Sequence, residues 1–476
     1  MRLRSVFAWL LLTILCTTGN AQTRQADAEP SASRLAHLYP LPRYEEDWTF
    51  LRGTSGSSDF WDFTKFVPLA EHGRFFLSLG GEARETYERF HNTSFGLSTQ
   101  DADGYLLQRY LLHGDLHYGS KFRFFAELNS SLENGRTGGP RPLIDEDRLD
   151  VHQGFVDLVL PSSRPNSAVT LRIGRQELAF GSGRLVALRE GPNVPLSFDG
   201  IQASLTLAAL RVTAFATRPV QNKSGIFDDP PQPGSAFWGV YASRSNLAGL
   251  ANIDFYYFGL NRRRAIFNQG VGEETRHSLG ARFWKTSQHW SLDAEGIYQF
   301  GNFGGGTISA WRLADDSAYT FSSIRFRPRV AVATDIASGD RDPRDPDLQT
   351  FNAMFQSGTY SGRAQILGPN NAIRLEPSVA LQLAEWVTAS AGWGFYWRQN
   401  AGDGLYGIPG NLIVPANGVS SRYEGSRPIA QVDWQVTRHL SAHLNYIYVF
   451  NARFEEQSVH GTHSMSFVSP WITYRF

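Results

Sequence analysis

Arginine is the residue type in this sequence with the most chemistry to offer. Of the 45 basic residues, only Lys65, Lys121, Lys223 and Lys285 are lysine, and all the others are arginine. A planar guanidinium binds a carboxylate through two parallel hydrogen bonds, and rings of arginine in a pore favour anions. A genome rich in G and C would produce the same preference for arginine, so the positions of the arginines must carry the argument.

Several arginines lie in segments where apolar and polar residues alternate. Between Tyr105 and Tyr118, one set of alternate positions carries Leu106, Tyr110, Leu112, Leu116 and Tyr118, while Arg109 and Asp115 lie in the other. This period of two predicts a β-strand with one apolar and one polar face. A charged side chain that faced lipid would be costly, so we predict that the polar faces line an enclosed, aqueous lumen. The arginines on these polar faces are Arg84, Arg109, Arg123, Arg172, Arg282 and Arg374.

Carboxylates share these polar faces with the arginines. Arginines without nearby acids would hold a polyanion too tightly, and conduction requires release as well as binding. We therefore predict several weak anion sites in series, in which acids orient and partly neutralise the arginines. The alternative, that these ions only pair with one another to fill the lumen, stays open. The acids concerned are Glu82, Asp115, Glu127, Asp157, Asp293, Glu295 and Asp433.

Sequence motifs of enzymes are absent. The chain has no His-Glu-x-x-His, no Gly-x-Ser-x-Gly and no glycine-rich phosphate loop. His113, Asp115 and His117 form a polar trio that a barrel hydrolase could use, but a network lining the lumen is the preferred interpretation. The acidic run from Asp340 to Asp347 is broken by prolines that disturb the ligand spacing of a calcium loop. We predict no enzymatic activity, no catalytic residue, no metal and no cofactor.

The composition and the first residues indicate an exported protein. The 476 residues carry 45 basic and 45 acidic side chains, so no net charge favours nucleic acid as a partner. Residues 1–21 are predicted to be a signal peptide, because Arg2 and Arg4 precede an apolar run that is too short to span a bilayer as a helix. Cys16 is the only cysteine, so the mature chain is expected to have no disulfide.

The elements that must position the polar residues are strands. From about Phe75 onward, alternating segments are separated by eight short and nine longer connections, which gives about eighteen antiparallel strands. The longer connections include Arg262 to Glu274 and Gly301 to Gly306. We predict an all-β transmembrane barrel over residues 75–476 in the bacterial outer membrane. A periplasmic arm over residues 22–74 is expected to precede it.

A soluble β-sandwich also has alternating strands. The end of the sequence helps to distinguish it from a membrane barrel. Residues Pro470 to Phe476 place apolar side chains at alternate positions before a final phenylalanine. Such a segment is typical of the last strand of an outer-membrane barrel, and it resembles the signal that the barrel-assembly machinery reads. Closure would also remove the exposed edges that an open sheet of this length presents.

Several segments carry more specific signals than alternation. They are Arg43-Tyr44-Glu45-Glu46-Asp47-Trp48, Leu79-Gly80-Gly81-Glu82-Ala83-Arg84, Leu107-Gln108-Arg109-Tyr110-Leu111-Leu112-His113, Ala337-Ser338-Gly339-Asp340 and Thr350-Phe351-Asn352. The most specific stretch runs from Arg172 to Gly200 and includes Arg172-Ile173-Gly174-Arg175-Gln176-Glu177-Leu178 and Arg189-Glu190-Gly191-Pro192-Asn193. Together these segments resemble the alginate export family of bacterial outer-membrane porins, over nearly all of the mature chain.

The resemblance implies an eighteen-stranded barrel that exports the polyuronate alginate through an arginine-lined constriction. It places Arg84, Arg109, Arg175, Arg184, Arg189 and Asp199 near the pathway. Combined with the polar faces, the predicted pathway comprises Glu82, Arg84, Arg109, Asp115, Arg123, Arg172, Arg175, Arg184, Arg189, Asp199 and Arg374. The expected partners are an anionic polysaccharide or oligosaccharide, outer-membrane lipid and lipopolysaccharide, and the barrel-assembly machinery. The alternatives are a general or other substrate-specific porin, a barrel hydrolase, and a barrel with a plugged lumen.

Overall fold

The computed structural model describes residues 39–53, 59–70, 73–101, 103–161, 167–247, 249–358, 362–408 and 410–476. The predicted signal peptide, residues 1–21, lies outside these ranges. Within them, no helix has the length and apolar character that crossing a membrane requires.

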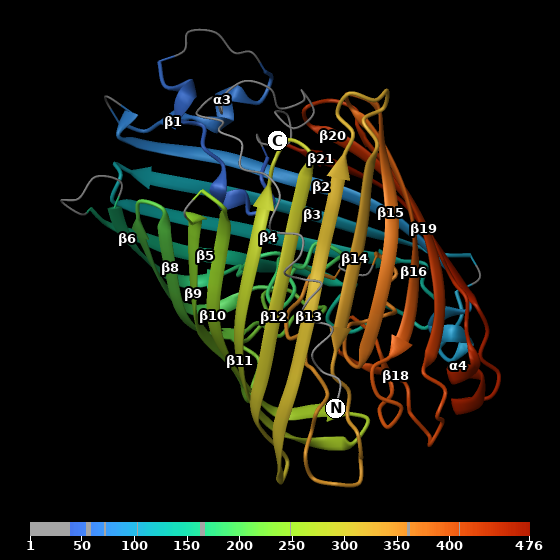
Figure 1. Cartoon of the computed structure of the whole chain (residues 1–476). Helices are drawn as coiled ribbons and strands as arrows, with labels where there is room; N and C mark the ends of the chain where they lie inside the picture. Colours follow the sequence, from blue (N-terminus) through green and yellow to red (C-terminus); the bar gives the residue numbers. More distant parts are fainter. Residues whose placement is uncertain are drawn as a thin grey trace.

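The chain forms one large antiparallel sheet that closes on itself (Figure 1). All of its nineteen strands except the two-residue β1 belong to the closed ring, which therefore has eighteen strands, as predicted. The ring closes where β2 pairs with β21, with Arg84 opposite Thr473 and Phe90 opposite Phe467. The strands of the ring are β2 (Phe75–His91), β3 (Tyr105–Tyr118), β4 (Phe122–Asn134), β5 (Asp147–Pro161), β6 (Ser167–Gln176), β7 (Phe198–Leu207), β8 (Leu210–Pro219), β9 (Ser235–Leu247), β10 (Ala251–Phe267), β11 (Gly270–Thr286), β12 (Trp290–Phe303), β13 (Gly306–Thr320), β14 (Arg329–Ala337), β15 (Ala372–Ala384), β16 (Val387–Arg398), β19 (Tyr423–Gln435), β20 (Leu440–Val449) and β21 (Met465–Arg475).

Alternation along the strands separates the residues into an inner and an outer face. On β3, Arg109 is 0% exposed, whereas Leu112 is 55% exposed. The same contrast recurs around the ring: on one strand after another, apolar side chains are exposed on the outer face. Examples are Leu160, Ile173, Ile201, Phe255, Leu279, Leu313 and Ile472. This apolar outer belt is the surface that a barrel presents to lipid.

Connections at the two ends of the ring differ in length. One end, here called the short-turn end, has brief turns such as 119–121, 208–209 and 385–386. The other, the long-loop end, carries most of the long connections. Two of the connections predicted to be long are two-residue turns instead, at 268–269 and 304–305. The strand pairing continues through the predicted loops, because Arg262 and Glu274 pair as opposite residues of β10 and β11, with 2.5 Å between their charged groups.

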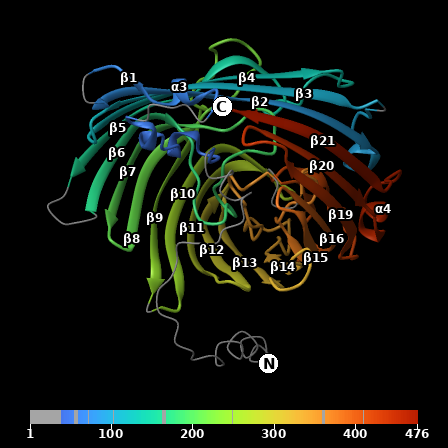
Figure 2. The ribbon, with the colours of Figure 1, turned by 90° about the horizontal axis from the view of Figure 1, so that it is seen from above.

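Three connections from the long-loop end fold into the ring (Figure 2). They are the loop 177–197, the loop 338–371 (described at 338–358 and 362–371), and the loop 399–422 (described at 399–408 and 410–422). The last of these includes β17 (Leu405–Tyr406) and β18 (Leu412–Val414). The first two are held together by backbone hydrogen bonds: Phe355 N donates to Leu185 O at 2.8 Å, and Ala187 N donates to Phe355 O at 2.9 Å. The apolar core of the protein therefore lies inside the ring, where these loops cover the inner aromatic residues Phe198, Phe215, Phe237 and Phe258.

Residues 39–53 and 59–70 precede the first barrel strand and lie across the seam between β2 and β21. This segment, the arm, contains η1 (Arg43–Glu45), η2 (Thr49–Leu51), α3 (Asp62–Lys65) and β1 (Val67–Pro68). Arg43 donates from Nη1 to Gly81 O and from Nη2 to Phe476 O, both at 3.0 Å, so it joins the first and last strands. The Trp61 ring stacks on Phe476, with 4.2 Å between centroids.

Gly80 explains why the arm fits so closely against β2. A Cβ atom at Gly80 would lie 2.7 Å from Nζ of Lys65, which is fully buried. The same Cβ atom would lie 2.6 Å from the ring of His113, so glycine at this position leaves room for both side chains.

Substitution Arg43→Ala is expected to destabilise the closed barrel by roughly 2–4 kcal/mol, because two charge-assisted hydrogen bonds across the seam are lost. The measurement is the temperature at which the folded band disappears on an SDS gel of heated samples. Arg52→Ala is the matched control, since Arg52 is exposed in the same arm and contacts the ring of Phe66 rather than the seam. Equal unfolding temperatures for the two variants would contradict the assigned role of Arg43.

Candidate functional site

The central cluster of charges lies on the inner face of β2 and β3. Arg109 donates to Oε1 of Glu82 from Nη2 at 2.6 Å and from Nε at 3.0 Å. It also donates from Nη2 to Oε2 of Glu190 at 2.9 Å, and Glu190 belongs to the inward loop 177–197. Arg475 donates to the second oxygen of Glu82 at 2.8 Å. The cluster therefore combines charges from the first, second and last strands with one from a loop.

Strand register places two positive charges opposite each other in this cluster. Arg84 and Arg109 are direct partners in the β2–β3 pairing. Like charges in such a position repel each other, so the pair needs compensation. Arg84 obtains part of it from the inward loop, because it donates to Glu190 O at 2.8 Å and to Pro192 O at 2.9 Å.

Positive groups outnumber negative ones around this point. Arg363, from the loop 338–371, lies over the ring of Trp471 with its Cζ 4.0 Å from the centroid. In this cluster, three buried N–H groups have no hydrogen-bond acceptor among the described residues: Nε of Arg84, Nη1 of Arg109 and Nε of Arg363. An unmet buried donor costs about 1–3 kcal/mol, so the cluster has capacity for an additional acceptor.

Arg184, a residue of the loop 177–197, fixes this loop to the wall formed by β12 and β13. This guanidinium lies 2.8 Å from Asp293, 3.0 Å from Glu295 and 2.6 Å from Asp316, on the inner faces of β12 and β13. Arg374, on β15, lies 3.9 Å from Asp316. Arg184 is thus a single cation that connects the loop to three acids of the wall.

Arg189 and Asn193 hold the same loop from within. Arg189 donates to the carbonyls of Val194, Leu143 and Pro195. Burial lowers the pKa of Arg189 to about 10, so the group remains charged at neutral pH. Asn193 donates to three backbone carbonyls of the wall and the neighbouring connection, those of Gln108, Leu132 and Asp145.

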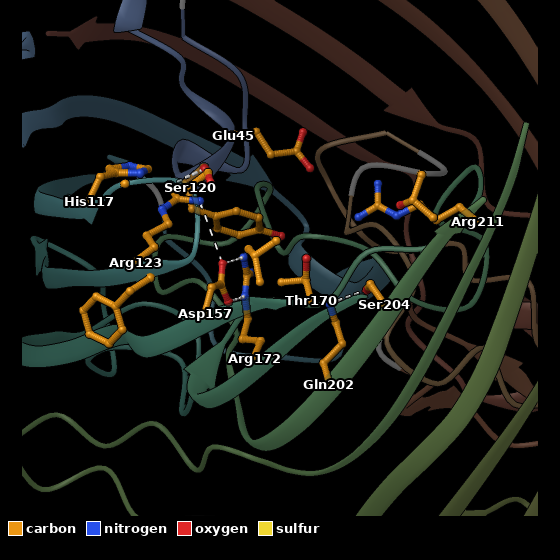
Figure 3. Close-up of a pocket in the computed structure, with 15 residues that line it drawn as sticks. Glu45, His117, Ser120, Arg123, Asp157, Thr170, Arg172, Gln202, Ser204 and Arg211 are labelled. Atoms are coloured by element: carbon orange, nitrogen blue, oxygen red, sulfur yellow. Dashed lines mark hydrogen bonds and ion pairs between the residues drawn. The ribbon is translucent and has the colours of Figure 1, made fainter. Parts of the chain in front are cut away.

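A cavity of about 370 Å³ lies at the short-turn end, between the arm and the inner faces of β3 to β8 (Figure 3). Arg172 holds Asp157 through two hydrogen bonds of 2.7 and 2.8 Å. Its guanidinium lies between the rings of Tyr44 and Phe155, 4.2 and 3.8 Å from their centroids. Arg123 binds Asp115 in the same two-bond manner and also donates to the carbonyl of Tyr44. We call this space the arm cavity.

The residues predicted to form one pathway fall into several places. Glu82, Arg84 and Arg109 meet in the central cluster. Asp115, Arg123 and Arg172 gather beside the arm cavity, and Arg184 and Arg374 approach Asp316. Arg189 supports the inward loop.

Arg175 and Asp199 lie elsewhere. They are paired opposite each other on β6 and β7, two positions from Ile173 and Ile201, whose side chains are about half exposed on the outer face. Arg175 therefore binds Asp199 outside the lumen, at 2.8 Å, and also donates to the carbonyl of Asp229. The period of two assigns this pair to the outer face because no register shift intervenes between positions 173 and 175.

Some residues of the sites were not among the predicted ones. Glu190 and Arg363 lie in loops, where no periodicity marks the residues that point inward. Arg211 lines the arm cavity and lies at the start of β8. Its inner-face neighbours Thr213 and Thr217 carry a polar signal that could have identified it.

The polar trio of His113, Asp115 and His117 is divided between different partners. His117 approaches Asp115 at 3.0 Å, but His113 faces Glu127, 3.6 Å away, and stacks on Phe125. Asp115 is already bound by Arg123 through both oxygens. The three polar groups therefore serve different partners along the wall.

Comparison with protein families gives a match to the model described as alginate export, over residues 75–461. No curated protein matches the chain. Similar solved structures include Pseudomonas aeruginosa OpdK with vanillate, with a TM-score of 0.55 at 11% identity, covering 84% of this chain and 98% of that chain. Pseudomonas aeruginosa OccD3 (OpdP) gives a TM-score of 0.57 at 12% identity, covering 87% and 93%. Pseudomonas aeruginosa OccK2 (OpdF) in complex with glucuronate gives 0.54 at 13% identity, covering 86% and 98%. At these identities the likeness concerns the fold.

Substitution Arg184→Met is expected to loosen the loop 177–197, because the loop loses its ion pairs with Asp293, Glu295 and Asp316 of the wall. Single-channel recording in planar bilayers should show larger or more variable conductance than in the unsubstituted protein. Arg148→Met is the control, since Arg148 is 65% exposed and lies outside the ring of inward contacts. Unchanged recordings for Arg184→Met would show that this cation does not hold the loop.

The loop 338–371 is expected to respond to pH through Asp340. Burial, and then the neighbouring Asp403, raise the pKa of Asp340 to about 7 from its ordinary value of 3.8. Because the docked loop holds this proton more tightly than the free loop, docking weakens as the pH rises from about 4 to about 7 and then levels off. Hydrogen exchange of residues 338–358, corrected for intrinsic rates, should be faster at pH 8 than at pH 5. Asp340→Asn should abolish this difference, and persistence of the difference in that variant would exclude Asp340 as its source.

Proposed function

Because the chain belongs to the alginate export family, we propose that this outer-membrane pore conducts an anionic polysaccharide or oligosaccharide of the polyuronate type. The family and the fold are those of a transport barrel rather than of an enzyme. With the membrane identified, the short-turn end is the periplasmic end, as is usual for barrels of this class.

The central cluster is the observation that carries the proposal. Arg84 and Arg109 face each other across β2 and β3, and both retain a buried N–H group without an acceptor among the described residues. A carboxylate passing this point would supply acceptors to both guanidinium groups, and such charge-assisted hydrogen bonds are the strong ones. A neutral sugar would leave the excess positive charge unmatched.

Acids around the arginines favour release. Arg109 is shared between Glu82 and Glu190, so a passing carboxylate competes with two resident ones. The same holds for Arg123 with Asp115 and for Arg172 with Asp157. Competition of this kind gives weak sites in series, which conduction of a polyanion requires.

Similar barrels offer a chemical parallel. OccK2 was solved in complex with glucuronate, and OpdK with vanillate, and both molecules are small organic anions. Glucuronate is a uronate, and a polyuronate is a chain of uronate units. The pathway that we propose contains Glu82, Arg84, Arg109, Asp115, Arg123, Arg172, Arg184, Arg189 and Arg374, and it leaves out Arg175 and Asp199, which lie on the outer face.

Further partners follow from the same proposal. The outer apolar belt is in contact with lipid and, on the outer leaflet, with lipopolysaccharide. The last strand, β21, is the segment that the barrel-assembly machinery would read during insertion. A general porin remains the alternative, and selectivity distinguishes it from a polyuronate pore.

The reconstituted pore is expected to be anion-selective in planar bilayers with a salt gradient, and oligouronates should block its current while neutral oligosaccharides of the same length should not. Arg109→Gln should move the reversal potential toward zero and weaken the block by roughly tenfold, the effect of losing about 1.4 kcal/mol. The physical reason is that one strong carboxylate-binding group leaves the lumen.

Arg175→Gln is the matched control for this measurement, since the same charge is removed from the outer face of β6. Heat-modifiable migration on SDS gels establishes that both variants have closed barrels. A cation-selective pore, or equal block by charged and neutral oligosaccharides, would refute the proposal.

A further inference from the structure

The arm cavity offers a binding site that is separate from the central cluster. We propose that it binds a single uronate unit, with Arg211 as the residue that binds the carboxylate; this inference rests on the proposed passage of polyuronates. The cavity volume of about 370 Å³ lies within the ~300–1,000 Å³ typical of small-molecule sites. Its lining includes Tyr44, Glu45, Thr170, Gln202, Ser204 and Arg211.

Arg211 differs from the other two arginines of the cavity because its guanidinium has no ion pair with a described residue. Arg123 and Arg172 are each bound to an aspartate through two hydrogen bonds. Arg211 is exposed, and its side chain makes no ion pair or hydrogen bond with any residue in the described ranges. It lies on the inner face of β8, in line with Thr213 and Thr217. Its guanidinium points toward the cavity (Figure 3).

Glu45 provides an opposing charge that faces Arg211 in the cavity. The η1 turn of the arm presents this carboxylate opposite Arg211, and it too has no ion pair among the residues that the structure places (Figure 3). A carboxylate that entered would be attracted by Arg211 and repelled by Glu45. The balance of the two gives a site that binds weakly and releases readily, which is the behaviour required at the entrance of a pore.

Neutral polar groups line the wall of the cavity near these two charges (Figure 3). Thr170, Gln202, Ser204 and Thr206 come from the inner faces of β6 and β7. Gln202 donates to Ser204 Oγ at 3.4 Å, and Ser204 Oγ shares a hydrogen bond of 3.0 Å with Thr213. Hydroxyl and amide groups both donate and accept, so this surface suits the hydroxyl groups of a sugar ring. Arg211 would bind the carboxylate, and these groups would bind the ring.

The arm is an integral part of this site. Tyr44 contributes one wall, and its ring packs edge-on against Phe125 and Phe155 of the barrel. Its carbonyl accepts a hydrogen bond from Arg123, which fixes the adjoining residue Glu45 at the cavity. The site therefore exists only while the arm is docked at the periplasmic end.

The test is isothermal titration of D-glucuronate into the full chain in detergent micelles, with D-glucose as the neutral probe. Glucuronate should bind and glucose should not. Arg211→Gln should weaken glucuronate binding by about tenfold or more, the effect of losing a charged hydrogen-bond donor. Glu45→Gln should strengthen binding, because the opposing charge is removed.

Arg329→Gln is the matched control, since Arg329 is an exposed arginine on the inner face of β14 at the same end and does not line the cavity. It should bind glucuronate as the unsubstituted protein does. Absence of glucuronate binding in the unsubstituted protein, equal losses in Arg211→Gln and Arg329→Gln, or weaker binding in Glu45→Gln would each overturn the site. An anion-selective pore with any of these results would leave the proposed function standing, whereas a cation-selective pore would refute that function independently.

Discussion

The whole structure depends on the need to pair every backbone amide and carbonyl of a chain that lies in lipid. An open sheet leaves one edge unpaired at each side, and the pairing of β2 with β21 removes both edges at once. Closure then turns each strand's alternation into a division between inside and outside. Leu112 faces outward and Arg109 faces inward. They are an odd number of residues apart on β3, so their side chains lie on opposite faces of the closed sheet.

Inside the ring, charges and loops support one another. Arg84 and Arg109 would repel each other if the wall stood alone, and the loop 177–197 compensates them with Glu190 and two backbone carbonyls. The same loop reaches the opposite wall through Arg184. The arginines that we propose for anion passage therefore also hold the loops that narrow the lumen. Their acidic partners keep the resulting anion sites weak.

The arm contacts both the seam between the first and last strands of the ring and the arm cavity. Arg43 connects Gly81 with Phe476, while Tyr44 and Glu45 form a wall of the arm cavity. One short turn therefore bridges the seam that β2 and β21 close, and it lines the arm cavity at the short-turn end. Gly80 belongs to this arrangement, because its missing side chain makes room for Lys65.

The sequence by itself determined the eighteen strands, the inner position of residues such as Arg109, and the family, since strand periodicity and motifs are local properties. Arg175 shows the limit of motif similarity, because alternation with Ile173 places it on the outer face. The tertiary structure alone decided which charges meet. Arg109 and Glu190 are 81 positions apart, and Arg43 reaches a carbonyl 433 positions away. Loops have no period, so their inward contacts depend on long-range packing that only the closed barrel supplies.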